Sequence, residues 1–411
     1  MQVLHPHCAG LDVHKDSVVA CVRHMDERGR ASEAVRSFGT TTRQLLELGD
    51  WLAAEGVTHV AMESTGVYWK PVWNLLEGRG LELLLANAHH VKQVPGRKTD
   101  VKDCQWIAQL LQHGLLRPSF VPDRPQRELR DLTRQRAQLV MDKTRVANRV
   151  HKTLEDANIK LASVASDVLG KSGRDMLRAL IAGETDAAAM AQLARMRLRT
   201  KIPQLAEALR GGVNEHHRFM LKMLLEQVEY LEQQVECFDR RIEQVMTPFE
   251  MEAVRRLDTI KGLNVRAAQN VVAEIGHDMG RFPTADHLCS WAGICPGNNQ
   301  SAGKRRSGRT TQGNRWLKRT LTQCAWAAAR CKDSHLAARY KRVAARRGRK
   351  RAVLAVAHSQ LVAAYEMLKR GEDYHDLGPD YRDRRSGERL TRQLVDRLTH
   401  LGYKVTLEPA A

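Results

Sequence analysis

The order of short apolar and amphipathic stretches between residues 8 and 111 most limits the folds open to this chain. Three β-branched stretches follow one another up to residue 40, with Asp12 in the first, Val18 to Val22 in the second and Ala34 to Phe38 in the third. The polar run from Asp26 to Arg30 predicts a hairpin turn. Beyond residue 40 the spacing predicts a helix over 41–55, a strand ending at Glu63, a helix over 68–79, a strand over 81–87 and a helix within 98–111.

Three strands, helix, strand, helix, strand, helix is the order of a ribonuclease H-like α/β domain, which we expect over residues 1–122. Its carboxylates fall where such a sheet gathers them: Asp12 on the first strand, Glu63 at the end of the fourth, and Asp100 with Asp103 on the next helix. Four carboxylates on neighbouring elements supply the oxygen ligands of two hard cations, typically Mg²⁺. Two such ions assist phosphoryl transfer.

Each of these acids also has a plain structural interpretation. Asp100 and Asp103 lie one turn apart on one helix face, and acids in a first turn are favoured by the positive helix end. Asp12 alone would be a strand-end turn residue, and Glu63 alone a strand-terminal cap. An acid within an apolar strand is costly without a partner, so the metal-site hypothesis gains weight for Asp12 and Glu63.

Charge points to the class of partner. The 411 residues carry a formal net charge of +19, which favours a polyanion, most often nucleic acid. No apolar run is long enough to span a membrane, and the N-terminus lacks a secretory signal pattern, so we expect a cytoplasmic protein without a membrane partner.

The eight cysteines indicate no standard metal motif, since no CxxC pair occurs in the sequence. His277, His287, Cys289 and Cys295 lie near one another in the chain, but their spacing fits no common zinc site. Buried, reduced thiols are the better interpretation.

Residues 123–250 are predicted to be a long helical and coiled-coil region. Its first helix is rich in basic residues, which form either a solvated face or a track for a nucleic-acid backbone, and the overall charge favours the track: Arg130, Arg134, Arg136, Lys143, Arg145, Arg149 and Lys152. Residues 217–247 carry apolar residues at alternating spacings of three and four, the pattern of a coiled-coil seam. The seam fits a hairpin within the chain or a contact between subunits, and we favour a role in oligomer assembly.

Residues 251–370 are predicted to form a mostly helical domain, and residues 371–411 a peripheral tail. Residues 254–282 have the outline of a helix-hairpin-helix, which offers backbone N–H groups to phosphates, or of a plain αα-hairpin. A loop rich in small residues follows from Cys295 and leads into a helix capped near Asn314.

This loop carries candidate nucleic-acid ligands: Lys304, Arg305, Arg306, Arg309, Asn314 and Arg315. Ser301 and Ser307 are candidate nucleophiles, but a serine needs a base or a metal to become one. Composition alone therefore favours a loop that binds phosphate without forming a covalent bond.

Taken together, these stretches resemble the DEDD transposases of bacterial insertion sequences, a group that includes site-specific pilin-gene invertases. The matching segments are GLDVHKDS around Asp12, AMESTGVYW around Glu63, RKTDVKDCQWIAQLL around Asp100 and Asp103, TIKGLNVRAAQNVVAEIG, and PGNNQSAGKRRSGRTTQGNRWL around Ser301. The resemblance runs from about residue 5 to about residue 370 and keeps the motifs in order.

The resemblance implies a RuvC-like N-terminal domain with Asp12, Glu63, Asp100 and Asp103 as its metal-binding tetrad. It implies that Ser301, in a C-terminal transposase domain, becomes covalently joined to DNA. It also implies a homodimer or homotetramer that recombines donor and target DNA with a structured noncoding RNA as guide, the tetrad and the serine coming from different subunits. The family pattern often has glycine after the serine, where this chain has Ala302.

Other functions remain open to these residues. One is a Mg²⁺-dependent junction endonuclease that hydrolyses DNA with water and uses Ser301 only to bind phosphate. Another is a non-catalytic nucleic-acid scaffold with structural carboxylates, and a regulatory RNA-binding protein is a weaker third. No GxxxxGK[ST] sequence is present, so the sequence shows no P-loop ATP site.

Overall fold

The computed structural model describes residues 2–26, 29–64, 66–93, 103–297, 299–385 and 387–407. The chain divides into two compact units, residues 1–122 and 123–411. None of the helices in the described ranges is both long and apolar enough to cross a lipid bilayer.

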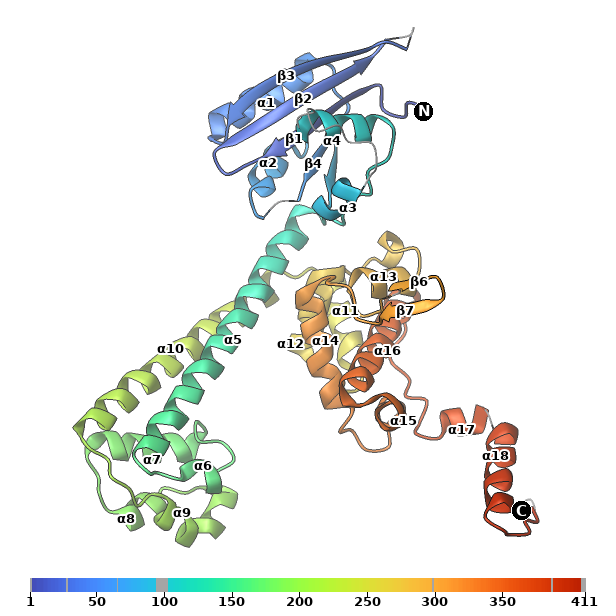
Figure 1. Ribbon diagram of the computed structural model, residues 1–411. Helices are drawn as coiled ribbons and strands as arrows, with labels where there is room; N and C mark the ends of the chain where they lie inside the picture. The colour runs from blue at the N-terminus through green and yellow to red at the C-terminus, as the bar shows by residue number, and fades with distance from the viewer. Residues whose placement is uncertain are drawn as a thin grey trace. The chain divides into compact units, whose positions relative to one another are not determined.

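The N-terminal unit is built on one mixed sheet (Figure 1). Its described elements are β1 (His7–Val13), β2 (Ser17–Met25), β3 (Ala31–Gly39), α1 (Thr42–Ala54), β4 (His59–Glu63), α2 (Trp69–Leu76), β5 (Glu82–Ala86), α3 (Ala88–Gln93) and α4 (Asp103–Gln112). The strands lie in the order β3-β2-β1-β4-β5, with β1, β2 and β3 antiparallel and β4 and β5 parallel to β1. This is the predicted ribonuclease H-like topology.

Each face of this sheet is covered by different helices. On one face, Leu11 and Val13 pack with apolar residues of α1 and α2. On the other, Cys8 and Ala61 pack with α4 residues such as Ile107. The alternation of side chains along a strand produces this division, and it places α4 against the second face of β1.

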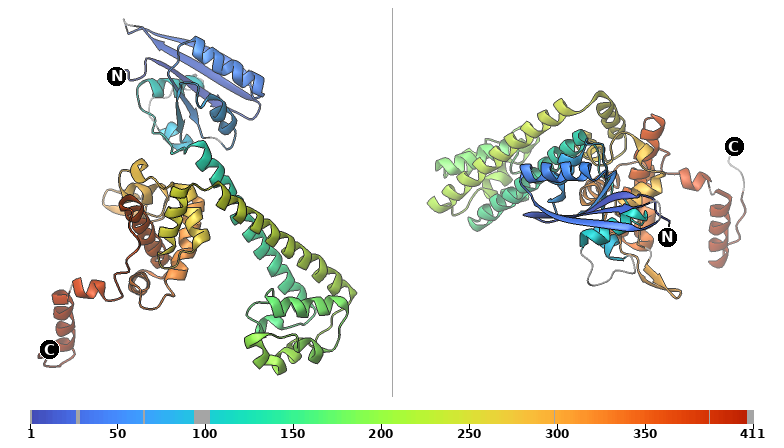
Figure 2. Two further views of the ribbon diagram at one scale, coloured as in Figure 1. Left: turned by 180° about the vertical axis from the view of Figure 1, so that it is seen from behind. Right: turned by 90° about the horizontal axis from the view of Figure 1, so that it is seen from above.

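The C-terminal unit begins with a pair of long helices that run side by side (Figures 1 and 2). These are α5 (Arg124–Asp156) and α10 (Glu215–Val245), which begin at the side-chain caps Asp123 and Asn214. His217 lies 3.0 Å from Asp156, and Arg136 lies 2.8 Å from Asp239, so the two helices are antiparallel. The heptad seam predicted over 217–247 is thus filled by α5 of the same chain.

An apolar cluster closes the far end of this helix pair. It is formed by Val150 and Leu154 of α5, Leu221 and Leu225 of α10, and residues of the intervening elements. Those elements are α6 (Leu161–Val164), α7 (Lys171–Ala182), α8 (Ala187–Ala191), η1 (Met196–Lys201) and α9 (Ile202–Ala208).

The remainder of the unit is mostly helical, as predicted. Its elements are α11 (Pro248–Asp258), α12 (Val265–Ile275), η2 (Met279–Arg281), α13 (Ala285–Trp291), β6 (Asn299–Ser301), β7 (Lys304–Ser307), α14 (Arg315–Ala328), α15 (His335–Arg347), α16 (Arg349–Arg370), α17 (Tyr381–Arg385) and α18 (Gly387–His400). Helices α11 and α12 form the expected helical hairpin. A Cβ on its turn residue Gly262 (φ +90°) would overlap the backbone of Cys324 and Ala328 in α14, so this glycine allows the hairpin to pack closely.

Candidate active site

Asp12, the next-to-last residue of β1, and Glu63, the last residue of β4, lie at the carboxyl ends of two adjacent parallel strands. Leu11 of β1 pairs with Met62 of β4, and each is followed directly by one of the two acids. The carboxyl ends of parallel strands meet at one edge of a sheet, which is where open α/β sheets bind their ligands. The sheet register therefore brings Asp12 and Glu63 to one edge.

The two acids also belong to the same face of the sheet. Gly10 lies against α4, because a Cβ on it would overlap the backbone of Cys104 and Ala108. Ala61 packs in the same cluster as α4 residues. Side chains two residues apart point to the same face, so Asp12 and Glu63 lie on the face that α4 covers.

The direction of α4 brings Asp103 towards this edge. Gln112, at the end of α4, accepts hydrogen bonds through its carbonyl oxygen from the N–H groups of Leu4 (2.9 Å) and His5 (3.2 Å), just before β1. The helix therefore runs opposite to β1, and its first residue, Asp103, immediately precedes Cys104, whose backbone meets Gly10. Gly10 is two residues from Asp12, so three of the four predicted acids occupy one region of the unit.

The fit of this region to a metal ion is partial. Asp12 Oδ2 lies 3.0 Å from Nε2 of His14, so a ring nitrogen already contacts that carboxylate. Within the described ranges, no three His, Cys, Asp or Glu side chains stand close enough to hold a metal ion. Asp100 lies outside the described residues. The donors have the chemistry of a Mg²⁺ site, but the described part of the chain does not show a complete ligand set.

Ser301 ends the first strand of a short hairpin, β6–β7 (Figure 1). Its backbone pairs with Lys304, and the connecting residues Ala302 and Gly303 have φ values of +48° and +75°. Positive φ at both central positions is the pattern of a type I′ turn, which suits the twist of a tight hairpin. The turn therefore sets Ser301 at the hairpin tip, although its side chain lies outside the description.

The predicted nucleic-acid ligands around this hairpin divide into exposed side chains, side chains outside the description, and Asn314, which makes internal contacts. Lys304, Arg309 and Arg315 are exposed. The side chains of Arg305 and Arg306 lie outside the description.

Asn314 is committed to internal contacts. Its Oδ1 accepts hydrogen bonds from the backbone of Trp316 (3.0 Å) and Leu317 (3.1 Å), capping α14, and its Nδ2 donates to Glu274 (2.7 Å). The sequence correctly predicts the cap, but these contacts leave this side chain little capacity to bind DNA as well.

Lys318, which the motif reasoning missed, organises the loop that follows the hairpin. Its Nζ lies 2.6 Å from Oγ1 of Thr310 and 3.2 Å from the carbonyl oxygen of Thr311. Burial and the nearby Arg309 lower the pKa of Lys318. Ser307, the alternative nucleophile, accepts a hydrogen bond from the N–H of Arg309 at 3.1 Å.

Three arginines predicted to lie on a nucleic-acid track have internal roles instead. Arg130 and Arg136 are buried, and Arg134 is paired with a carboxylate, Glu274, whose side chain is 2% exposed. Arg136 donates to Asp239 (2.8 Å) and to Asn270 (2.8 Å). That part of the prediction was wrong because a buried guanidinium needs partners, and α10 and α12 provide them. Glu274 was missed, although an acid within the apolar run 271–275 is a signal of a buried pair.

Comparisons with known proteins identify the family of the chain. Residues 9–159 match a family model described as a transposase of the DEDD, IS110 type, and residues 254–341 match the IS116/IS110/IS902 family of transposases. The chain is also 27% identical over 311 residues to the insertion element IS110 uncharacterized 43.6 kDa protein of Streptomyces coelicolor, an alignment that covers 69% of this chain and 74% of the relative. The two family matches include the sheet with its acids and the serine hairpin, and the chain therefore belongs to the IS110 family of DEDD transposases, enzymes that recombine DNA.

Proposed function

We propose that this transposase cuts and rejoins donor and target DNA through a covalent bond between Ser301 and a DNA phosphate, at a Mg²⁺ site formed by Asp12, Glu63, Asp100 and Asp103. The observation that carries the proposal is the common edge of β1 and β4, where the register and the direction of α4 gather Asp12, Glu63 and Asp103. Acids gathered at one sheet edge repel one another unless a cation or a proton lies between them.

The proposed reaction has two balanced steps. In the first, Oγ of Ser301 attacks the phosphorus, the bond to one DNA oxygen breaks, and the serine proton leaves while the released oxygen is protonated. In the second, a DNA hydroxyl attacks the phosphoserine, which frees the serine and restores a phosphodiester. One ester bond forms for each that breaks, so no nucleotide cofactor is consumed. Bound Mg²⁺ would supply charge neutralisation at the phosphate.

Residues around the hairpin would bind the DNA phosphates. Lys304 and Arg309 are exposed on or directly after the hairpin, where they can neutralise charge near Ser301. Because the turn residues Ala302 and Gly303 fix the hairpin, the position of Ser301 is set by the backbone. A preorganised nucleophile lowers the entropic barrier to attack.

Two further features of the function are proposed. A structured noncoding RNA would guide target choice, which agrees with the net charge of +19 and a need for a second polyanion. A homodimer or homotetramer would combine carboxylates and serine from different subunits. The α10 seam is filled by α5, but Phe219, Met223 and Tyr230 are exposed on α10 and offer apolar contact area to a second copy.

Labelled DNA distinguishes this proposal from hydrolysis. Wild-type protein with Mg²⁺ should trap a covalent protein–DNA adduct that survives denaturing electrophoresis, and Ser301→Ala should abolish both the adduct and strand exchange. Ser307→Ala is the matched control and should retain both. Cleavage that persists in Ser301→Ala would support the hydrolytic endonuclease, and DNA binding without Mg²⁺-dependent cleavage would support a scaffold.

Mixing variants tests the shared active site. Asp12→Asn and Ser301→Ala should each be inactive alone. Mixed oligomers should regain part of the activity, because some active sites then combine an intact carboxylate set with an intact serine. A mixture as inactive as its components would contradict the division of the site between subunits.

A further inference from the structure

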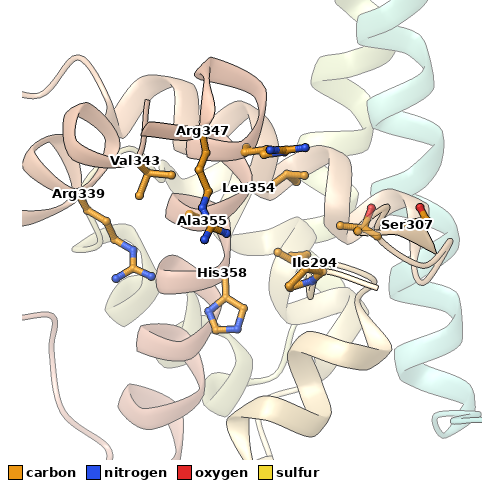
Figure 3. Close-up of a pocket in the computed structure, with 12 residues that line it drawn as sticks. Ile294, Ser307, Arg339, Val343, Arg347, Leu354, Ala355 and His358 are labelled. Atoms are coloured by element: carbon orange, nitrogen blue, oxygen red, sulfur yellow. The ribbon is translucent and has the colours of Figure 1, made fainter. Parts of the chain in front are cut away.

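A pocket of about 540 Å³ opens on the C-terminal unit beside the base of the β6–β7 hairpin. Arg339, Val343 and Arg347 of α15 line it together with Arg351, Leu354, Ala355 and His358 of α16, and the segments around Ile294 and Ser307 close it. Figure 3 shows Arg339, Arg347 and His358 extending into the space, with Ile294 and Ser307 on the facing side. A cavity of this size suits a small ligand or one unit of a polymer.

The charge of the lining favours an anion. Arg339, Arg347 and Arg351 line the pocket, and no acidic residue of the described chain does so. Nε of Arg339 is buried and has no hydrogen-bond partner in the described structure. Burial, together with the charges of Arg342 and Arg382, lowers the pKa of Arg339. A buried donor without a partner is costly, and an anion would satisfy it.

The basic surface continues beyond this pocket. A neighbouring pocket of about 470 Å³ shares Arg339, Val343 and Arg347, and no acid is among its described lining residues. It adds three further arginines: Arg342, Arg346 and Arg382. Two adjoining cationic pockets on one helix suit successive charges along a chain better than one isolated phosphate. A nucleic-acid strand has that regular spacing of charge.

Part of the lining is apolar. Ile294 and Pro296 contribute from the loop before the hairpin, and Leu354 and Ala355 from α16, which also carries His358. Burial and Arg339 lower the pKa of His358, while Asp286 opposes that shift, so its ring tends to be neutral at neutral pH. Apolar side chains and a neutral ring favour contact with the face of a nucleobase.

We propose that this arginine pocket binds one nucleotide of a single nucleic-acid strand, with the phosphate on Arg339, Arg347 and Arg351 and the base against Ile294, Leu354 and His358. Ser307 lines the pocket and pairs with Asn299 at the base of the hairpin that carries Ser301. A strand bound in the pocket is therefore anchored next to the hairpin. The inference rests on the proposed function only in taking nucleic acid as the partner.

Binding measured without catalysis tests the inference. A fluorescent single-stranded deoxyribo-oligonucleotide is titrated into full-length protein in EDTA and followed by anisotropy. The Arg347→Ala/Arg351→Ala double variant should bind about 10-fold or more weakly. The slope of the logarithm of its binding constant against the logarithm of salt concentration should become shallower by about 1.4, because two phosphate contacts on a single strand are lost. The matched control, Arg349→Ala/Lys350→Ala, removes two exposed charges of the same helix that do not line the pocket, and it should bind nearly as wild type.

A second variant separates the pocket from general surface charge. Ala355→Phe fills the cavity and removes no charge, so it should also weaken binding while the thermal midpoint stays close to that of wild type. Competition with the ribo-oligonucleotide of the same sequence shows whether the protein prefers ribose or deoxyribose. If Ala355→Phe abolishes that preference, the result supports the pocket. Equal losses in the two double variants, unchanged binding by Ala355→Phe, or competition by inorganic pyrophosphate as strong as by either oligonucleotide would each overturn it.

The catalytic proposal and this one fail separately. Ser301→Ala should bind the oligonucleotide like wild type in EDTA, because its change affects chemistry alone. If no covalent adduct forms in any assay, the anisotropy results alone still decide whether the pocket binds nucleic acid.

Discussion

Arg134 of α5 forms a two-point ion pair with Glu274 of α12, with Nε 2.7 Å from Oε1 and Nη2 2.8 Å from Oε2. Glu274 also accepts from Nδ2 of Asn314, the cap of α14, at 2.7 Å. One buried carboxylate thus joins three helices, including the helix that follows the serine hairpin.

Replacing Glu274 with Ala should destabilise the C-terminal unit by about 3–5 kcal/mol, because it leaves a partly buried guanidinium without its partner. Urea unfolding followed by tryptophan fluorescence measures this, since Arg134 lies over the ring of Trp316 at 5.9 Å. Glu252→Ala breaks an exposed pair with Arg255 and should leave the unfolding midpoint unchanged. Equal shifts of the unfolding midpoint in the two variants would show that the buried pair contributes no more to stability than the exposed pair.

Gly10→Ala should abolish DNA cleavage without removing a single proposed ligand. The added Cβ would overlap the backbone of Cys104 and Ala108, so α4 must move away from the sheet and take Asp103 with it. Gly212→Ala, where nothing lies near the added atom, is the control and should remain active. Full activity of Gly10→Ala in a strand-cleavage assay would contradict the placement of α4.

Ala302→Gly should stabilise the serine hairpin. Ala302 has a φ of +48°, and an L residue in that region costs about 1–2 kcal/mol relative to glycine. Hydrogen exchange of the Lys304 amide should slow, and strand exchange should be retained. Ala302→Pro cannot adopt this φ and should lose strand exchange; faster amide exchange in Ala302→Gly would argue against the I′ turn.

Leu221→Ala should destabilise the helix pair by about 2–5 kcal/mol, since it leaves a cavity in a closely packed cluster. Leu221 is 1% exposed and Met223, two residues on, is 48% exposed. Met223→Ala is therefore the matched control in a urea titration monitored by circular dichroism. If Met223→Ala proves the more damaging in dilute protein, the α10 seam described here is assigned to the wrong face.

The alternation of patterns before residue 112 was sufficient to predict the N-terminal sheet, because strand and helix periods differ and the turns carry glycine. It was not sufficient for every side chain: Leu46, part of the same leucine-rich helix as Leu45, is exposed, while Trp51 fills the buried face. Local spacing cannot show which neighbour covers a helix face.

Long-range partners explain the remaining differences. The sequence of α5 alone suggests that Arg130 and Arg136 are surface cations. Their partners Glu274 and Asp239 lie more than 100 residues away in the chain, so local sequence cannot predict that these arginines are buried. The heptad pattern of α10 likewise does not show that α5 is the helix it packs against. The arginine pocket escaped the motif analysis because it combines α15, α16 and a loop that no single sequence pattern unites.

The claim on which the account depends is that Asp12, Glu63 and Asp103 share a divalent ion. It is tested most directly by titrating Mn²⁺ into Ser301→Ala protein bound to DNA, which prevents turnover, and measuring free Mn²⁺ by electron paramagnetic resonance. The account predicts that Asp12→Asn in this background loses the tight Mn²⁺ sites, whereas Asp16→Asn, an exposed acid just beyond β1, keeps them. Identical Mn²⁺ binding by the Asp12→Asn protein and its parent would contradict it.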